Sequence, residues 1–211
     1  MRIAVVNEVS ACHRNRDIIG ALRELGYEPL NLGMSDPAQK PELTYLHTGL
    51  MSALALQLGI ADIVVGGCGT GQGYLNAVMQ YPGVVCGLLT EPLDAWLFCR
   101  INGGNCVSLA LNKGYGWASE RNLVMLFDAL LSAHGEAGYP ASRVESQTQS
   151  RERLNAISRA AHPAMDRILS SLEPWLVNPV FGFEPFRQAL SLGAEGRLLT
   201  QCLALADAAQ E

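Results

Sequence analysis

Short apolar runs without alternating polarity recur along the first 135 residues of the chain. Five of them predict strands, at residues 2–7, 28–32, 63–65, 84–89 and 106–111. A strand that is apolar on both faces is typical of a parallel sheet covered by helices on both sides. Between them lie segments with helical spacing, at 14–25, 45–58, a stretch ending near Pro82, 92–101 and 117–133. The pattern predicts a three-layer α/β/α, Rossmann-like fold with a five-stranded parallel sheet.

The composition changes after residue 135. Residues 135–150 are polar and contain Gly, Pro and Ser, which indicates a connecting arm, and a polar-faced helix is expected from 150 to about 172. Two more helical patterns, 185–192 and 197–208, follow. We therefore divide the chain into a sheet domain (1–135), an arm with its helix (136–172) and a C-terminal helical extension (173–211) used for packing or for a subunit contact.

Charge and composition narrow the class of protein. Only 17% of the residues are charged and 49% are hydrophobic, so an unusually large share of the surface must be buried and we expect a homodimer or homotetramer. A net charge of -5 without a Lys/Arg-rich run disfavours nucleic-acid binding. No apolar stretch is long enough for a membrane span, and the start MRIAVVNEV does not resemble a signal peptide, so we expect a cytoplasmic protein.

The six cysteines are spread along the chain. They form neither a C-x-x-C pair nor a Cys/His cluster at zinc spacing, so we expect neither a disulfide framework nor a metal site. Most of them are expected to be small core residues.

A glycine-rich turn, residues 66–73 (GGCGTGQG), follows the third predicted strand. In an open parallel sheet, ligands bind beyond the carboxyl ends of the strands. The glycines at 69, 71 and 73 let a ligand approach the backbone N–H groups, which together with the next helix start favour negative charge. The spacing is not G-x-G-x-x-G and the turn does not follow the first strand, which disfavours dinucleotide binding.

Cys68 lies inside this turn. Cysteines beside helix starts ionise more readily than ordinary thiols. A nucleophilic hydrolase would also need a histidine, and none of the four histidines lies in a predicted strand-end turn. A lone thiolate beside N–H donors is suited to removing a proton next to a carbonyl, because the turn can hold the enediolate oxygen. The alternative is a buried structural thiol in a tight turn.

Several segments together resemble the family of type B ribose-5-phosphate isomerases and galactose-6-phosphate isomerases. They are RIAVVNE at the start, ELTYLHTG, the CGTGQG turn, TEPLDAW and INGGN. The resemblance implies that Cys68 is the base that moves a proton between C1 and C2, without a cofactor or metal, and that Thr70 with the backbone of Gly69, Gly71 and Gly73 holds the enediolate. It also implies these substrate-binding residues: Asn7, Glu8, Tyr45, Asn102, Asn105, Arg143 and Arg153.

The chain departs from that family in two segments. Glu8-Val9 stands where relatives have Asp-His, and Ile101 stands where they have a histidine linked to opening the sugar ring. Glu8 can accept hydrogen bonds from sugar hydroxyls, but Val9 cannot hold phosphate and Ile101 cannot move a proton. The substrate is therefore expected to be open-chain, such as a four-carbon sugar phosphate, unless its ring opens in solution or through another group.

Phosphate would then need other cations. In relatives, arginines of a C-terminal arm supply part of them, which points to Arg143, Arg151 and Arg153; paired N–H donors suit arginine to phosphate. His13, Arg14 and Arg16 are rival phosphate ligands, and a solvated helix face is the structural alternative. We expect an aldose-ketose isomerase of four- to six-carbon phosphorylated sugars. The alternatives are a thiol-dependent transferase or hydrolase and a non-catalytic sugar-phosphate-binding protein.

Overall fold

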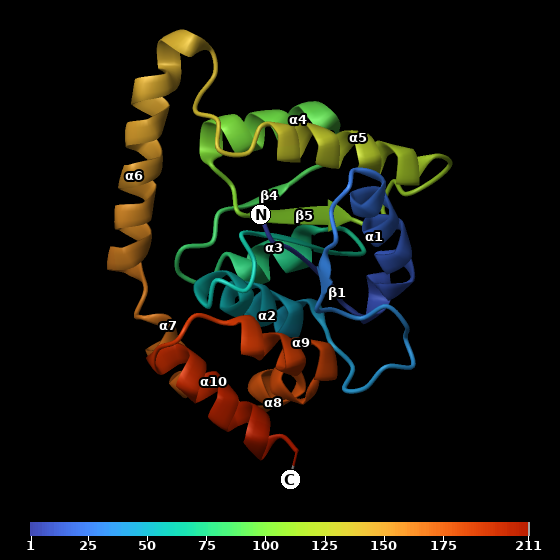
Figure 1. Ribbon diagram of the computed structural model, residues 1–211, viewed down its shortest axis with the longest axis vertical. Coiled ribbons are helices and arrows are strands. Elements are labelled where there is room, and N and C mark those ends of the chain that lie inside the picture. Colours follow the sequence, from blue (N-terminus) through green and yellow to red (C-terminus); the bar gives the residue numbers. More distant parts are fainter. Residues whose placement is uncertain (211) are drawn as a thin grey trace.

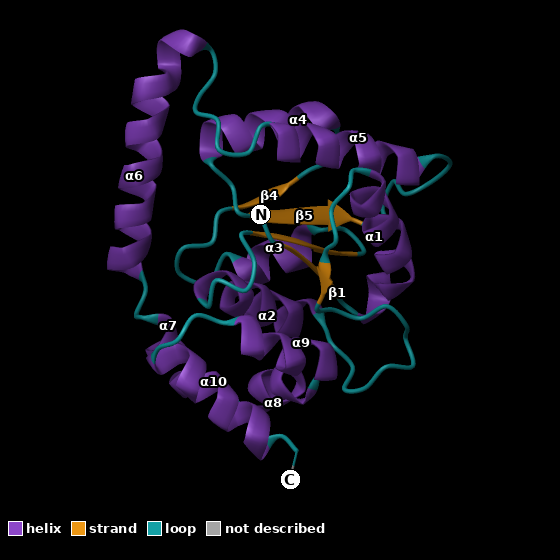
Figure 2. Cartoon of the chain, in the orientation of Figure 1, coloured by secondary structure: helices purple, strands orange, loops and turns teal. Residues whose placement is uncertain are grey.

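The computed structural model describes residues 1–210, and their first part contains a five-stranded, all-parallel sheet in the order β2-β1-β3-β5-β4. Its strands are coloured orange in Figure 2. The strands are β1 (Ile3–Asn7), β2 (Leu30–Asn31), β3 (Ile63–Cys68), β4 (Cys86–Leu88) and β5 (Cys106–Ala110). The predicted parallel sheet is confirmed, although β2 and β4 are shorter than expected. The pairing of Asn7 with Gly67 and of Cys68 with Ala110 places the carboxyl ends of β1, β3 and β5 at one edge.

Helices cover both faces of the sheet, as the apolar strands require (Figure 1). One face carries α2 (Tyr45–Gln57) and α3 (Gln72–Val78), and the other carries α1 (Asn15–Glu24), α4 (Pro92–Leu97) and α5 (Ser119–Ser132). Successive residues of β3 alternate between the two cores, Val64 facing α2 and Val65 facing α5. Cys68, at the end of the same strand, belongs to the α2 side.

The C-terminal helices pack against α2. They are α7 (Met165–Ser171), α8 (Pro174–Gly182), α9 (Glu184–Ala189) with a following 3-10 turn (Leu190–Leu192), and α10 (Arg197–Ala208). Phe181, Phe186 and Cys202 are buried in the same core as Leu50 and Leu54 of α2. This explains why α2 is apolar on all sides: the sheet covers one side and the extension another. Residues 165–210 thus share a core with the sheet domain.

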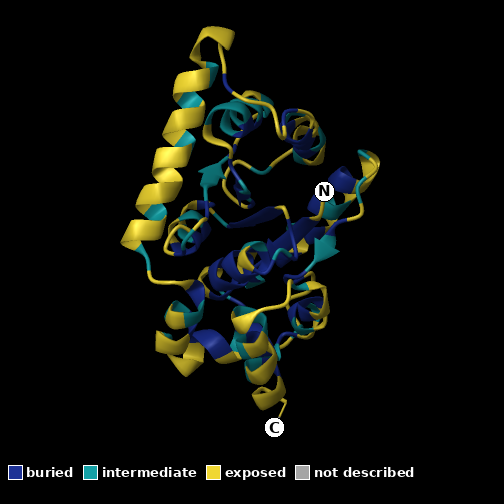
Figure 3. Ribbon diagram, turned by 60° about the vertical axis from the view of Figure 1, so that its left-hand side comes forward, coloured by how far each residue is buried: buried dark blue, intermediate teal, exposed yellow. Residues whose placement is uncertain are grey.

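Helix α6 (Val144–Ala161) stands along one side of the molecule, with no buried residue (Figure 3). The predicted connecting segment and polar-faced helix are present, but their predicted bounds, 135–150 and 150–172, were wrong. The helix begins earlier because 144–150 contain neither Gly nor Pro, and the Gln147 amide bonds both backbone groups of Tyr139. It ends at Ala161 because Pro163 disfavours a helical conformation of the residue before it.

Helix α8 was missed by the sequence analysis. Its two prolines, Pro174 and Pro179, look like helix breakers, but Pro174 occupies the first turn, where no N–H is needed. Leu176, Val177 and Val180 are buried and hold the helix against α2. Among residues 1–210, none of the helices combines the length and the apolar character that crossing a membrane requires.

Candidate active site

The turn after β3 has the geometry that its glycines predict. Gly71 lies in the left-handed region (φ +75°), and a β-carbon there would collide with Leu88, so only glycine fits without strain. Its N–H donates to the carbonyl oxygen of Cys68 at 3.2 Å. The backbone therefore reverses within three residues, and the N–H of Gly71 is used for the turn itself.

Other amides of the turn are left without an acceptor. Within residues 1–210, the N–H groups of Gly69, Thr70 and Gly73 have no hydrogen-bond partner, while the amide of Gln72 donates to Thr70 Oγ1 at 3.4 Å. Thr70 is exposed and Gly69 and Gly73 are half-buried, so solvent or a ligand can reach this part of the turn. Free backbone N–H groups in a glycine-rich turn favour an anionic oxygen.

Cys68 stands directly before these amides. Its side chain is 6% exposed, and Sγ lies 4.0 Å from Thr70 Oγ1. Three other cysteines, Cys12, Cys99 and Cys202, are also buried. Burial raises the pKa of the Cys12 and Cys99 thiols, and that of Cys202 to about 12. Those three thiols stay protonated at neutral pH.

Glu8 follows β1 at the same edge of the sheet. Its carboxylate is buried and accepts hydrogen bonds from the backbone N–H of Ser10, at 3.0 Å, and from the Ser10 hydroxyl. These contacts fix a negative charge at the carboxyl end of β1. The carboxylate retains lone pairs for a hydroxyl donor.

Asn112 joins the loops that follow β1, β3 and β5, and the sequence analysis missed it. Its side-chain amide donates to the carbonyl oxygen of Ser10 at 3.1 Å, and its backbone N–H donates to the carbonyl oxygen of Gly69 at 3.0 Å. The signal that would have found it is positional: Asn112 is the first polar residue after the fifth apolar run, at the edge where Glu8 and Cys68 also lie.

Tyr45 is the first residue of α2 and closes another side of the site. Its ring atoms lie 3.3 Å from where a β-carbon of Gly73 would be, so the ring rests against the turn. It is 41% exposed. The backbone N–H of Val9 donates to the carbonyl oxygen of Leu43 at 2.9 Å, which fixes the segment before α2 beside the loop after β1. The structure thus brings together Glu8, Tyr45, Cys68, Thr70 and the turn glycines.

Asn7 belongs to the opposite side of the sheet from Cys68. Its side-chain oxygen accepts from Asn15 of α1 at 3.0 Å, and Asn15 also donates to Asn31 at 2.9 Å. The side chain is fully buried, and its amide nitrogen has no partner within residues 1–210. This placement does not support the predicted substrate contact, because alternate residues of a strand point to opposite faces.

Asn102 and Asn105 lie at the other end of the sheet. Asn105 precedes β5, roughly 16 Å along the strands from the Cys68 edge. Its side chain accepts from the N–H of Val85 at 2.8 Å and donates to the carbonyl oxygen of Gly83 at 2.9 Å. Asn102 ends a short π-helical turn (Phe98–Asn102) and is exposed. Within one chain, neither residue joins Cys68.

The arm arginines are also remote from Cys68 within one chain. Arg143, just before α6, donates to the Ser146 hydroxyl at 3.2 Å, and Arg153 is exposed on α6. Arg151 instead donates to the carbonyl oxygen of Ile101 at 2.8 Å and so attaches α6 to the end of the π-helical turn. Figure 1 places α6 beyond the amino end of β5.

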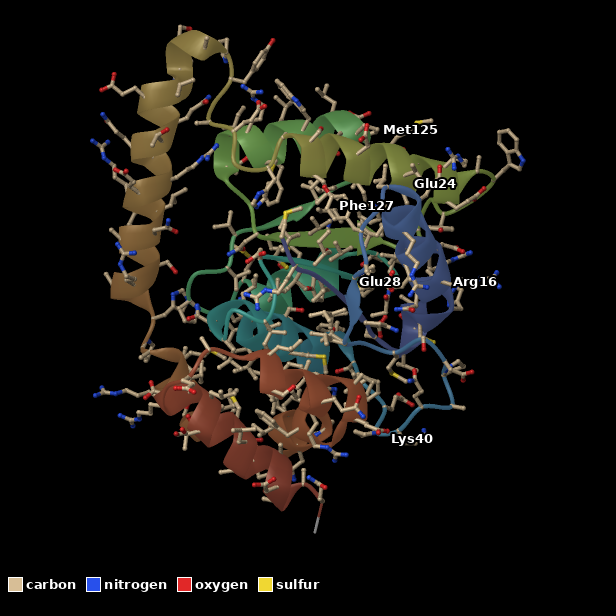
Figure 4. The ribbon with its side chains drawn as sticks, in the orientation of Figure 1. Arg16, Glu24, Glu28, Lys40, Met125 and Phe127 are labelled. Atoms are coloured by element: carbon tan, nitrogen blue, oxygen red, sulfur yellow. The ribbon has the colours of Figure 1, made fainter. Side chains whose placement is uncertain are left out.

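The alternative phosphate ligands after β1 are His13, Arg14 and Arg16. Arg14 contacts other side chains, and the other two are exposed to solvent. The Arg14 guanidinium lies 4.0 Å from the centre of the Tyr115 ring and 3.8 Å from Asp17. Burial, with the hydrogen bond that Tyr115 donates to Asp17, raises the pKa of Tyr115. His13 is exposed, and Arg16 projects into solvent from α1 (Figure 4). None of the three contacts the Cys68 turn.

A cavity of about 280 Å³ adjoins the turn on its other side. It lies between the carboxyl ends of β4 and β5 and the start of α5, and Thr70, Lys113 and Asn122 contribute polar groups to it. Cys68 does not line it. Thr70 is thus the residue that the cavity and the Cys68 turn share.

In chemical terms, the carboxyl edge combines one thiol, a row of free N–H donors and a buried carboxylate. A thiolate at Cys68 would lie within reach of a carbon acid whose oxygen is held by the amides. His47 lies two residues after Tyr45. Both of its ring nitrogens are already bonded, one to Thr44 and the other to the carbonyl oxygen of Trp175. The geometry therefore favours proton transfer over histidine-assisted acyl transfer.

The chain is similar to known sugar isomerases. The sequence pattern of the Ribose/Galactose Isomerase family matches residues 3–146. The structure is similar to a 4-deoxy-L-threo-5-hexosulose-uronate ketol-isomerase solved with a tartrate, at 32% identity over 98% of this chain and 100% of that one, with a TM-score of 0.91. It is also similar to a ribose-5-phosphate isomerase from Vibrio parahaemolyticus, at 34% identity over 99% of each chain, with a TM-score of 0.89.

A ribose-5-phosphate isomerase B from Clostridium thermocellum shares the fold, at 22% identity over 77% of this chain and 100% of that one, with a TM-score of 0.63. No curated protein matches the chain.

Proposed function

The chain belongs to the ribose/galactose isomerase family and is a sugar isomerase of this type, and we propose that it interconverts an open-chain aldose and ketose with Cys68 as the base. The observation that carries the proposal is the position of Cys68: its thiol precedes a turn whose N–H groups at Gly69, Thr70 and Gly73 have no acceptor within residues 1–210. A base beside an oxyanion site is what an enediolate reaction requires.

In the proposed mechanism, Cys68 removes the proton from the carbon next to the carbonyl group. The electron pair moves to the carbonyl oxygen, and the resulting enediolate oxygen is held by the free amides and by the Thr70 hydroxyl. The proton of the adjacent hydroxyl passes to the enediolate oxygen, so that the second oxygen can become the new carbonyl. The protonated Cys68 meanwhile returns its proton to the former carbonyl carbon. Glu8 accepts a hydrogen bond from a sugar hydroxyl, and the Tyr45 ring packs on the substrate.

The proposed substrate is open-chain and carries an anionic end, either a phosphate or a carboxylate. Two observations support the open-chain form: Val9 and Ile101 are apolar, so no imidazole stands at either position to assist ring opening. A carboxylate end is included because the uronate ketol-isomerase resembles this chain over nearly its full length, C-terminal helices included.

We further propose a homodimer in which the partner supplies the anion-binding arginines and Asn102. Helix α6, which carries Arg153 and directly follows Arg143, lies beyond the amino end of β5 (Figure 1). Helix α6 also exposes Leu154 and Ile157, at 55% and 62%, and these apolar side chains fit an interface. Cross-subunit donation would bring a guanidinium to the substrate's anionic end.

A substrate panel tests the proposal. The purified protein is given 4-deoxy-L-threo-5-hexosulose uronate, a tetrose phosphate and ribose 5-phosphate, and conversion is followed by NMR. We expect at least one open-chain compound to be converted with a kcat/KM about tenfold or more above that of ribose 5-phosphate, because ring opening is unassisted. Efficient turnover of ribose 5-phosphate alone would contradict the open-chain substrate. Binding without any conversion would indicate a sensor, and a trapped thioester would indicate acyl transfer.

A further inference from the structure

The first turn of α2 is bonded to the C-terminal helices through one imidazole. His47 is 6% exposed, and its Nδ1 accepts a hydrogen bond from the backbone N–H of Thr44 at 2.9 Å. Because that amide is a donor, Nδ1 is the unprotonated nitrogen and Nε2 carries the hydrogen. Nε2 then donates to the carbonyl oxygen of Trp175, 3.1 Å away in the first turn of α8. His47 thus connects two segments that are 128 residues apart.

His47 also replaces the usual residue of a helix cap. Thr44 is the N-cap of α2 and His47 is its third helical residue, where a capping box ordinarily has Glu or Gln. A carboxylate would satisfy Thr44 equally well, but it has no hydrogen to donate to Trp175. The histidine therefore does two things at once: it caps α2 and it binds the extension.

Tyr45 lies between Thr44 and His47 along the chain. It is the first helical residue of α2, and its ring rests on Gly73 of the catalytic turn. Tyr45 is 41% exposed, so packing covers only part of this residue. Its position therefore also depends on the backbone of the helix turn that His47 holds. The edge-to-face contact of the His47 and Trp175 rings, with centroids 6.1 Å apart, strengthens the same junction.

We propose that the C-terminal extension is part of the substrate site: through the Trp175 carbonyl it holds His47, a positioning residue that sets Tyr45 against the catalytic turn. This rests on the proposed function, in which Tyr45 touches the sugar. The family match ends at residue 146, before α8 begins, so the junction is a feature of the extended chain.

Three substitutions at His47 separate its two bonds. His47→Gln keeps an acceptor for Thr44 and a donor for Trp175, His47→Glu keeps only the acceptor, and His47→Leu removes both. On the compound that the panel identifies, we expect His47→Gln to resemble the wild type. His47→Glu and His47→Leu should raise KM about three- to tenfold with a smaller change in kcat, which is the size of one lost hydrogen bond.

A double substitution tests whether His47 acts through Tyr45. In a Tyr45→Ala background, His47→Leu should no longer change kcat/KM, because the group that it positions is absent. Equal effects of His47→Leu with and without Tyr45 would overturn the proposal.

A matched control addresses general stability. Val180 of α8 is fully buried in the shared core, so Val180→Ala loosens the extension without touching His47. We expect it to lower Tm and to leave KM unchanged. If Val180→Ala raises KM as much as His47→Leu does, the extension acts only as a stabiliser and the proposal is wrong.

An NMR readout keeps this test independent of turnover. The Tyr45 ring resonances should shift in His47→Leu and His47→Glu but not in His47→Gln or Val180→Ala. If this pattern holds while no compound is converted, the positioning role stands and the isomerase mechanism fails. If compounds are converted but the Tyr45 resonances do not respond, the positioning role fails.

Discussion

Polar residues lie at both ends of the parallel sheet, but their hydrogen bonding differs between the two ends. At the amino end, both functional groups of Asn105 are bonded to backbone groups of the loop before β4. At the carboxyl end, Cys68 precedes amides without an acceptor, and Glu8 is fixed by a neighbouring serine. A polar side chain near a sheet end is therefore a candidate for chemistry only where its own chain leaves its bonding capacity unused.

The largest effect is expected at the carboxyl end. Cys68→Ser should lower kcat by about 10²- to 10⁴-fold, because a hydroxyl is a far weaker base, while Tm changes little. Cys202→Ser is the matched control: Cys202 is fully buried in α10, so this change should lower Tm and leave kcat intact. Comparable kcat losses in both variants would remove the distinction between these two cysteines.

At the amino end, we expect a substitution to lower stability and to leave activity almost unchanged. Asn105→Ala should lower the free energy of unfolding by about 1–3 kcal/mol, because Val85 N–H and Gly83 C=O lose their partner. Urea denaturation measures this loss, and kcat/KM should change less than twofold.

Asn102→Ala is the control for that experiment, since Asn102 is exposed at the same end of the sheet. Its stability should be unchanged. If a partner subunit uses Asn102 as proposed, kcat/KM should fall instead. A loss of activity in Asn105→Ala at full stability would break the contrast between the two ends.

The smallest effect is expected for Asp94, whose carboxylate is bonded to Thr90 at the carboxyl end of the sheet. The Thr90 hydroxyl, which donates to Asp94 at 2.7 Å, holds the pKa of that carboxyl below its usual range. A depressed folded-state pKa stabilises the protein above the unfolded pKa of about 4, and this stabilisation is lost as pH falls through the folded value. Thr90→Val should therefore lower Tm slightly at pH 7, and the difference from the wild type should shrink as the pH falls below about 4. A Tm difference that stays constant as the pH is lowered would refute this origin.

Much of the sheet was predictable, because strands buried on both faces have continuous apolar sequences. The turn was predictable too, since GGCGTGQG combines glycines with a strand end. The sequence did not reveal that Gly71 N–H is used within the turn or that Asn7 points to α1. Both facts depend on tertiary register, which a local pattern does not encode.

The extension was the least predictable part. Helix α8 was not predicted because it contains Pro174 and Pro179. The first residues of α6 were predicted as a loop because they are polar. Asn112 and His47 were missed as well, because each bonds a segment distant in the sequence, Ser10 and Trp175 respectively. Such residues are found only when the strand order and the docking of the extension are known.

The most direct test of the account is proton exchange at the carbon next to the carbonyl. The substrate is incubated in D2O with the wild type, Cys68→Ser or Cys202→Ser, and deuterium at C1 and C2 is followed by NMR. We predict that the wild type and Cys202→Ser incorporate solvent deuterium at equal rates, while Cys68→Ser incorporates essentially none. Exchange by Cys68→Ser at the wild-type rate would contradict the assignment of Cys68 as the base.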